Sequence, residues 1–273
     1  MPALNFAARR PGERIIGRLN RIGLWTLYLK EVRRFWKVWT QTVAARTVTT
    51  VLFMAIFSFA LGGGGRTPAG VAYEAFIAPG LLMMTILQNA FQNPSSSILI
   101  SKVQGNIVDV LMPPLSPLEL TVGYIAGGIT RGLAVGLAVW IAFAAWPGLH
   151  PAVVHPLAFA YFAVMGSAFM AAFGAVVGIW ADKFDHAAGV NNFVILPLTL
   201  LSGTFYSIER LPPMVAKISL YNPFFYLIDG FRYSMIGRAD GEIATGVAVS
   251  FAATLALGCC VYALLKSGYK LKP

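Results

Sequence analysis

Long apolar runs are the feature of this sequence that most limits what it can fold into. Several of them reach the roughly 20 residues that an α-helix needs to cross a bilayer. The chain has 273 residues, of which 57% are hydrophobic and 12% charged, about half the charged fraction of a soluble domain. The sequence therefore predicts an all-α polytopic membrane protein and excludes an ordinary soluble globular fold.

The apolar runs divide the chain into an N-terminal region, 1–40, and a transmembrane domain, 41–273. We expect six transmembrane helices, because six apolar runs are separated by polar, proline-containing or glycine-rich segments. These helices are predicted at about 42–61, 73–92, 118–146, 153–180, 189–205 and 244–266.

The N-terminal region carries much of the positive charge. Nine of the 21 Lys and Arg residues lie in residues 1–40, beside the first expected span. That location favours anionic lipid over nucleic acid as the partner of a net charge of +10. We interpret residues 1–20 as a loosely ordered tail, and no cleavable signal peptide is expected because no apolar run follows the basic tip. Apolar and basic residues fall on different faces of 22–40, which predicts an amphipathic helix in the headgroup plane; a partner-binding helix is the alternative.

The distribution of lysine and arginine also predicts the orientation. Six spans place both termini on one side of the membrane. The basic N-terminal region then shares a compartment with Lys102, Lys183 and the three C-terminal lysines. Because basic residues accumulate on the cytoplasmic side, both termini are expected in the cytoplasm.

A polar, proline-bounded stretch, Asn93–Pro117, interrupts the apolar pattern between the second and third spans. Within it, apolar residues between Ile98 and Leu111 recur every three to four positions, which predicts a short amphipathic helix. The serines at 95–97 are candidate N-cap residues, and the prolines at 113–114 end the helix. Since it lies between two spans, its small apolar face is predicted to contact another protein.

The segment 206–238 has a different pattern. Its apolar pieces are each too short to cross a bilayer, and prolines and charges separate them. Non-helical backbone at membrane depth is tolerated only inside protein or beside water. We therefore expect two short re-entrant helices that enter the outer leaflet and return, with an interfacial loop as the alternative. The polar and proline positions of this segment are Glu209, Pro212, Pro213, Pro223, Asp229 and Arg232.

Two features of the expected spans are unusual for helices that contact only lipid. Glycines repeat at four-residue spacing on the third and fourth spans, which predicts close helix packing inside a bundle. Arg131 lies near the middle of the third span, where a charge is costly without a partner. Glu119 and Glu74 are the candidate partners, and a structural ion pair and a position in a substrate cavity both remain open. The glycines are Gly123, Gly127, Gly128, Gly132, Gly136, Gly174 and Gly178.

Sites for covalent chemistry are scarce. The sequence contains no GxxxxGK[ST] phosphate-binding loop, no HExxH zinc motif and no GxSxG nucleophile motif. Asp182, Asp185 and His186 form the only candidate metal group, and a solvated turn is the preferred interpretation, so no metal site is expected. An integral-membrane enzyme acting on lipid head groups would need this cluster. A scaffold or sensor subunit that transports nothing is a third alternative.

The sequence resembles the ABC-2 family of exporter permeases, especially the small permeases of bacterial inner membranes. The matching strings follow one another along nearly the whole chain: KEVRRFWKVWTQT, FIAPGLLMM, GNIVDVLMPPLSP, GYIAGGITRG, LPLTLLSGTFYSIERLPP and NPFFYLIDGFRY. The resemblance implies a permease subunit without ATPase activity of its own. Two copies would pair, each with a separate P-loop ATPase subunit, and ATP and magnesium would bind to that partner rather than to this chain.

The resemblance also implies roles for particular residues. A coupling helix docking to the ATPase would include Ser97, Ile98, Lys102, Val103, Gln104, Gly105, Ile107 and Val108. A connecting helix touching the same ATPase would include Lys30, Glu31, Arg33 and Arg34. The path of an amphipathic substrate, such as a lipid, a lipid-linked glycan or a drug, would run beside the first, second and fifth spans. Its candidate lining residues, which would serve equally well as bundle core, are Phe53, Met54, Phe57, Met83, Met84 and Leu87, together with Arg131.

Overall fold

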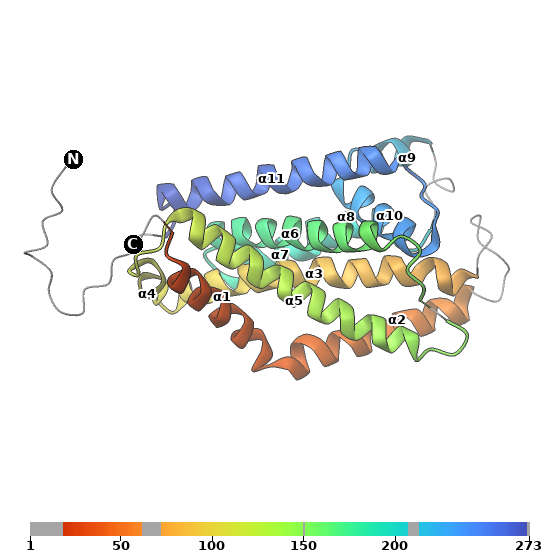
Figure 1. The fold of residues 1–273 in the computed structure, drawn as a ribbon, viewed down its shortest axis with the longest axis horizontal. Coiled ribbons are helices and arrows are strands. Elements are labelled where there is room, and N and C mark those ends of the chain that lie inside the picture. Colours follow the sequence, from red (N-terminus) through yellow and green to blue (C-terminus); the bar gives the residue numbers. More distant parts are fainter. Residues whose placement is uncertain (1–18, 62–71, 150, 207–212, 272–273) are drawn as a thin grey trace, which may run out of the picture.

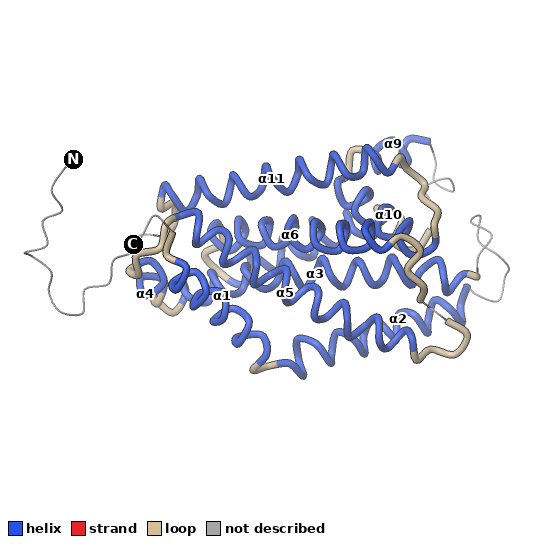
Figure 2. The backbone as a smooth tube through the Cα atoms, in the orientation of Figure 1, coloured by secondary structure: helices blue, strands red, loops and turns tan. Residues whose placement is uncertain are grey.

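The computed structural model describes residues 19–61, 72–149, 151–206 and 213–271. All regular structure in these ranges is helical (Figures 1 and 2). The α-helices are α1 (Arg21–Trp36), α2 (Ala45–Leu61), α3 (Tyr73–Val103), α4 (Ile107–Leu111), α5 (Pro117–Ala144), α6 (Pro156–Trp180), α7 (Phe184–Val190), α8 (Leu196–Leu201), α9 (Pro213–Leu220), α10 (Pro223–Ile236) and α11 (Ile243–Ser267). Two π-helical segments, Thr40–Ala44 and Asn191–Ile195, precede α2 and α8.

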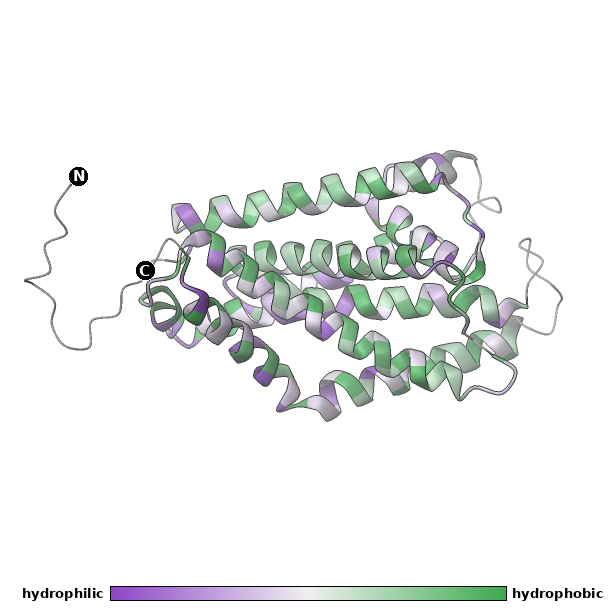
Figure 3. Cartoon of the chain, in the orientation of Figure 1, coloured by the Kyte–Doolittle hydropathy of each residue, from purple (hydrophilic) through white to green (hydrophobic). Residues whose placement is uncertain are grey.

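Five helical segments of the described chain are long and apolar enough to cross a membrane. They contain α2, α3, α5, α6 and α11, and most of their residues are hydrophobic (Figure 3). Helices α3 and α6 form the centre, since 78% of the most apolar window of each is buried. Only 11% is buried in the windows of α2 and α11, which lie at the periphery (Figure 1). These five match the first, second, third, fourth and sixth predicted spans.

The fifth predicted span, 189–205, is helical as far as Leu201. Helix α7, the π-helical segment Asn191–Ile195 and α8 follow one another without a gap, so the backbone is helical from Phe184 to Leu201. Pro197 lies just after the π-helical segment, where its missing N–H removes one backbone hydrogen bond. The stretch is not among the five candidate spans, so the six-span arrangement remains a prediction.

The expected break at Asn93 is wrong. Helix α3 continues through Pro94 and ends only at Val103, so the serines at 95–97 lie inside it and do not cap a new helix. Pro94 lacks the N–H that would donate to the carbonyl oxygen of Ala90, four residues earlier, but the helix continues through it. Two side-chain hydrogen bonds hold the backbone beside it. Ser96 donates to the carbonyl oxygen of Gln92 at 2.6 Å, and Arg34 donates to that of Asn93 at 2.6 Å.

Close helix packing at the glycine positions is confirmed. The glycines at four-residue spacing on α5 and α6 are buried. A Cβ atom added at Gly174 on α6 would overlap the backbone oxygen of Phe91 on α3. One added at Gly127 would come within 2.6 Å of Glu31 on α1. The small residues therefore hold α5 and α6 against α3 and α1 at backbone distance.

The segment before α11 contains the two short helices that were expected, α9 and α10. Glu209 and Pro212 lie outside the described residues, and Pro213 begins α9. Pro223 begins α10 directly after Asn222, whose side chain caps the helix by accepting from the Phe224 amide. Entry of this pair into the outer leaflet remains a prediction.

Candidate functional site

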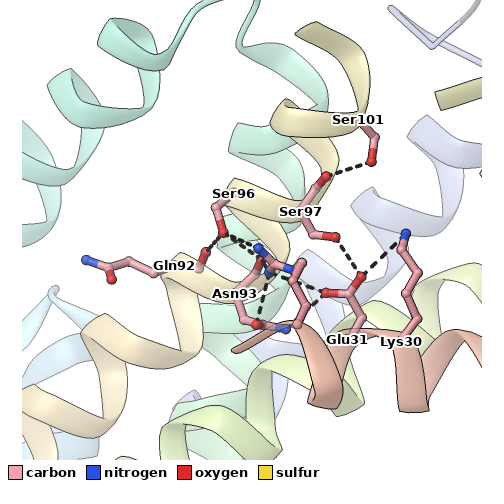
Figure 4. Close-up of polar contacts among 8 residues, drawn as sticks. Lys30, Glu31, Gln92, Asn93, Ser96, Ser97 and Ser101 are labelled. Atoms are coloured by element: carbon pink, nitrogen blue, oxygen red, sulfur yellow. Dashed lines mark hydrogen bonds and ion pairs between the residues drawn. The ribbon is translucent and has the colours of Figure 1, made fainter. Parts of the chain in front are cut away.

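A buried polar junction ties α1 to α3 (Figure 4). Glu31 on α1 is fully buried and accepts hydrogen bonds from Ser97 Oγ at 2.6 Å and from Asn93 Nδ2 at 3.2 Å, both on α3. Arg34 pairs with Glu31 at 3.4 Å and also reaches Asn93 and Ser96. We call Glu31, Arg34, Asn93, Ser96 and Ser97 the α1–α3 junction.

Both charged side chains of the α1–α3 junction have partners. Glu31 and Arg34 pair with each other on α1, and each also bonds to residues of α3. A buried carboxylate is stable only when paired and hydrogen-bonded, and Glu31 satisfies both conditions. Lys30 adds a looser contact at 3.8 Å from a side chain that is 43% exposed. Arg33 points to solvent. Of the four residues expected on a connecting helix, Glu31 and Arg34 therefore fix α1 to α3, whereas Lys30 and Arg33 are available at the surface.

The segment between α3 and α5 projects from one end of the bundle (Figure 1). Helix α3 ends at Val103, Gly105 turns the chain with a φ of +75°, and α4 follows. Positive φ favours glycine, because a Cβ atom would clash there. Apolar side chains stand exposed on this segment: Val103 at 53%, Val108 at 44% and Met112 at 76%. We call residues 103–114 the tip.

The residues expected to dock an ATPase are thus divided. Gln104 and Gly105 are exposed in the tip together with Val103 and Val108. Ser97 and Ile98 are buried inside the bundle on α3, and Ile107 packs inward from α4. The single short helix expected between Ile98 and Leu111 is wrong, because α3 ends at Val103 and the turn at Gly105 separates it from α4. The periodicity also did not separate the buried face from the exposed one.

Lys102 turns away from the tip toward the end of α6. Its ammonium group donates to the carbonyl oxygens of Ile179 and Ala181 at 2.6 and 2.7 Å. It also lies 3.5 Å from Asp182, which accepts a 2.6 Å hydrogen bond from Lys270. That hydrogen bond holds the pKa of Asp182 below its ordinary value of 3.8 and the pKa of Lys270 above 10.5.

The pairing of Asp182 bears on the metal alternative. Its carboxylate is engaged by two ammonium groups, which compete with a cation for the same oxygens. The His186 ring lies tilted against Trp180, 5.5 Å between ring centroids, and its Nδ1 accepts from the Asp182 amide. Across the described residues, no three His, Cys, Asp or Glu side chains are grouped as metal ligands would be.

A groove of about 330 Å³ runs between α2, α3 and α8. The lining changes from polar to apolar in the same direction along the two long helices of the groove. On α2 the lining changes from Arg46 through Thr49 and Thr50 to aromatic rings, and on antiparallel α3 it changes from Asn89 and Gln88 to apolar side chains. The polar end lies toward the end of the bundle that carries the tip. We call this the α2–α3 groove, lined by Arg46, Thr49, Thr50, Phe53, Phe57, Leu81, Met84, Thr85, Gln88, Asn89, Leu196, Leu200 and Phe205.

Arg131 does not pair with either expected carboxylate. Its guanidinium donates to Gln92 Oε1 at 3.2 Å, and Arg46 donates to the same oxygen at 3.4 Å. Glu119 instead closes a capping box with Ser116 at the start of α5, and Glu74 accepts from Ser58 at 2.8 Å. Both carboxylates are used near helix ends, so neither reaches the middle of α5.

Comparison with known proteins adds independent evidence. Residues 23–236 match the family described as ABC-2 type transporter. The chain is 35% identical over 257 residues to the inner membrane transport permease YadH of Escherichia coli strain K12, a match covering 92% of this chain and 97% of that protein. The chain belongs to the ABC-2 type transporter family.

More distant relatives match along a similar length. The chain is 26% identical to nodulation protein J of Neorhizobium galegae, covering 91% of this chain and 90% of that protein. It is 27% identical to nodulation protein J of Rhizobium leguminosarum bv. viciae, covering 85% and 88%. The likeness therefore extends across the bundle.

In this ABC-2 chain, the candidate path residues occupy two environments. Phe53, Phe57 and Met84 line the α2–α3 groove. The rings of Phe57 and Phe205 are tilted against each other, 4.4 Å between centroids, at the apolar end of the groove. In contrast, Met54, Met83 and Leu87 are completely buried in the core. Only the first group is placed to meet a molecule in the groove.

At the far end of the ABC-2 bundle, Asp229 and Arg232 form a buried pair 3.8 Å apart on α10. Asp229 also accepts from the amides of Asp240 and Gly241 at 2.9 Å. Arg232 donates to the carbonyl oxygen of Gly203 and stacks 4.3 Å from the ring of Phe76 on α3. The pair fixes α10 to the chain after α8 and to α3.

The sequence interpretation missed Gln92 and the role of Arg46 beside it. A signal was present, since Gln88, Asn89, Gln92 and Asn93 recur at helical spacing on an otherwise apolar segment. Uncharged amides in a span are expected to face protein or water, as Gln92 does here. Because the second span was expected to end at residue 92, these four amides were not recognised as one face of a continuous helix.

Proposed function

We propose that the chain is the permease subunit of an ATP-binding-cassette exporter, and that its tip docks a separate P-loop ATPase. The carrying observation is that α3 forms one 31-residue helix from the exposed tip to Tyr73. It passes the α1–α3 junction and lines the α2–α3 groove on the way. A displacement of the tip would therefore move the groove wall directly.

The ATPase would hold ATP and magnesium, since the chain carries no phosphate-binding loop. Its nucleotide cycle can shift the permease only if its two states bind the tip differently. The exposed apolar side chains Val103, Val108 and Met112 provide a surface for such a contact. The α1–α3 junction would make α1 and α3 respond together.

Two copies of the chain would pair, with one ATPase bound to each. Six spans with both termini in the cytoplasm would place the tip, Lys102 and the C-terminal lysines beside the ATPase. Helices α9 and α10 would be re-entrant helices of the outer leaflet. The name of the E. coli relative supports a bacterial inner-membrane location.

The substrate would be amphipathic. The α2–α3 groove is polar at the end near the tip and aromatic at the other. An amphiphile such as a lipid, a lipid-linked glycan or a drug matches that gradient, because each part of the molecule meets a surface of its own polarity.

Purification of the tagged chain from its native membrane tests the proposal. An equimolar P-loop ATPase is expected to copurify, as identified by mass spectrometry. Val103→Asp and Val108→Asp should reduce its recovery at least about tenfold, because a buried charge opposes an apolar contact. Val154→Asp makes the same change at the other end of the bundle, where Val154 is 50% exposed, and should leave recovery unchanged. Equal recovery with all three variants contradicts the assignment of the tip.

A further inference from the structure

Two guanidinium groups converge on a single neutral oxygen inside the bundle. Arg46 on α2 and Arg131 on α5 both donate to Gln92 Oε1, at 3.4 and 3.2 Å. An amide oxygen carries no net charge, so it satisfies hydrogen bonding without neutralising either arginine. The arrangement brings two positive charges together from different helices.

The surrounding charged groups do not offset these two positive charges. Within the described ranges, no carboxylate lies at ion-pair distance from Arg46 or Arg131. The charged groups acting on Arg131 are Arg34 and Arg46, both of the same sign. Glu31 is committed to the α1–α3 junction. A buried cation without a counter-ion is costly, and an anion from outside the chain would remove that cost.

Arg131 is also incompletely hydrogen-bonded. Its side chain is only 7% exposed, and its Nε has no partner. It lines a hollow of about 360 Å³ between α3 and α7, together with Gln92, Ser95, Ser96, Asn191 and Asn192. These five neighbours are uncharged donors and acceptors, and the rest of the lining is apolar. The hollow thus combines a guanidinium whose buried Nε has no partner with small polar groups, and its described lining includes no acidic residue.

Gln92 connects this hollow with the α2–α3 groove. It lines the hollow and bonds to Arg46, which stands at the polar end of the groove. From Arg46 the groove continues through Thr49 and Thr50 to Phe53 and Phe57. A ligand with a charged head and an apolar tail would place its head at the two arginines, in exchange for Gln92 Oε1, and its tail against the aromatic rings.

We infer that Arg46 and Arg131 form a binding site for an anionic phosphate head group of an amphipathic substrate, one whose phosphate is not neutralised by a cation of its own. Arginine recognises phosphate by paired, charge-assisted hydrogen bonds, for which the planar guanidinium is suited. This inference rests on the proposed function, because it specifies the substrate class of the same path. The inference narrows the proposed substrate class from amphiphiles of any charge to anionic amphiphiles.

Binding to the purified full-length chain in neutral maltoside micelles tests the site without an ATPase. The probes are dihexanoyl phosphatidic acid, dihexanoyl phosphatidylcholine and inorganic pyrophosphate, titrated by microscale thermophoresis. Phosphatidic acid should bind more tightly than phosphatidylcholine. Arg46→Gln and Arg131→Gln should each weaken phosphatidic acid binding about tenfold or more, since hydrogen bonds to charged groups contribute on that scale.

Lys266→Gln is the matched control. It removes one positive charge from an exposed residue at the same end of the bundle and should leave the affinity unchanged. Size-exclusion profiles check folding, and Arg46→Gln decides the result if Arg131→Gln aggregates, because Arg46 is partly exposed.

The outcomes separate the sources of the anion. Binding of phosphatidic acid alone supports a lipid head group, whereas comparable binding of pyrophosphate supports a site for phosphate itself. Equal affinity for both lipids, or an unchanged affinity in a folded Arg46→Gln chain, overturns the inference. If phosphatidic acid and phosphatidylcholine bind equally well while the ATPase still copurifies, the site is rejected and the permease function is retained.

Discussion

Ser97 on α3 donates a 2.6 Å hydrogen bond to Oε1 of Glu31 on α1, and the acceptor carboxylate is wholly buried. The two residues are 66 positions apart in the chain. Their contact joins the helix expected to lie along the membrane surface to the helix that carries the tip. The junction around them makes this a fixed attachment, because Glu31 also binds Asn93 and Arg34.

Glu31→Ala should lower the free energy of unfolding by about 3 to 5 kcal/mol, because Arg34 and Asn93 lose their buried acceptor. Ser97→Ala should cost about 1 kcal/mol, since Glu31 keeps its other partners. Lys30→Ala removes a half-exposed contact and should cost less than about 1 kcal/mol. Unfolding in mixed SDS micelles measures all three. A Glu31→Ala chain as stable as Lys30→Ala would contradict the junction.

Gly174→Ala should destabilise the bundle by about 1 to 3 kcal/mol, because the new methyl group overlaps the Phe91 carbonyl and separates α6 from α3. Gly258→Ala on α11 is the control. No atom lies within 4 Å of its added Cβ, so this change should raise helix stability by up to about 1 kcal/mol. Thermal unfolding in detergent distinguishes the two. Equal effects would show that α3 and α6 do not require glycine at their crossing.

The contact between Lys270 and Asp182 should depend on pH in two directions. The pKa of Asp182 is lowered by the hydrogen bond from Lys270, so the contact is complete above 3.8 and is lost as the pH falls through the folded pKa. The pKa of Lys270 is raised by the same hydrogen bond, so the contact is complete below 10.5 and is lost as the pH rises through the folded pKa.

A spin label at Tyr269→Cys, in a Cys259→Ala, Cys260→Ala background, measures this dependence. Its mobility should stay constant between about pH 5 and about pH 9 and rise beyond both limits. With Asp182→Asn, the label should be more mobile at neutral pH and show no acid transition. An acid transition that persists in Asp182→Asn would assign it to another group.

Arg232→Gln should lower the free energy of unfolding by about 3 kcal/mol, because Asp229 loses its buried counter-ion and the Gly203 carbonyl loses its donor. Arg238→Gln, an exposed change just beyond α10, should alter stability by no more than about 0.5 kcal/mol. Unfolding curves of the two variants compare them directly. Similar curves would mean that Arg232 does not fix α10 to α3.

Several elements were predictable because hydrophobicity acts along the chain. The apolar runs located the five long helices, and the glycine spacing identified the packed faces of α5 and α6. The continuity of α3 through Pro94 was not predictable from local pattern, because α3 is held there by contacts with other helices, including the hydrogen bond from Arg34 on α1 to the Asn93 carbonyl. The partner of Arg131 was missed for the same reason, since Gln92 lies on a different span.

The sequence by itself determined that this chain forms membrane-spanning helices and belongs to the ABC-2 family, because hydrophobic length and ordered motifs are properties of consecutive residues. Tertiary structure decided which side of each helix is buried and which is exposed. It buried Ser97, Ile98 and Ile107 while leaving Val103 and Val108 exposed, and it brought Arg46 and Arg131 to one oxygen. Burial and charge pairing depend on contacts between distant segments, and those contacts exist only once the helices have packed.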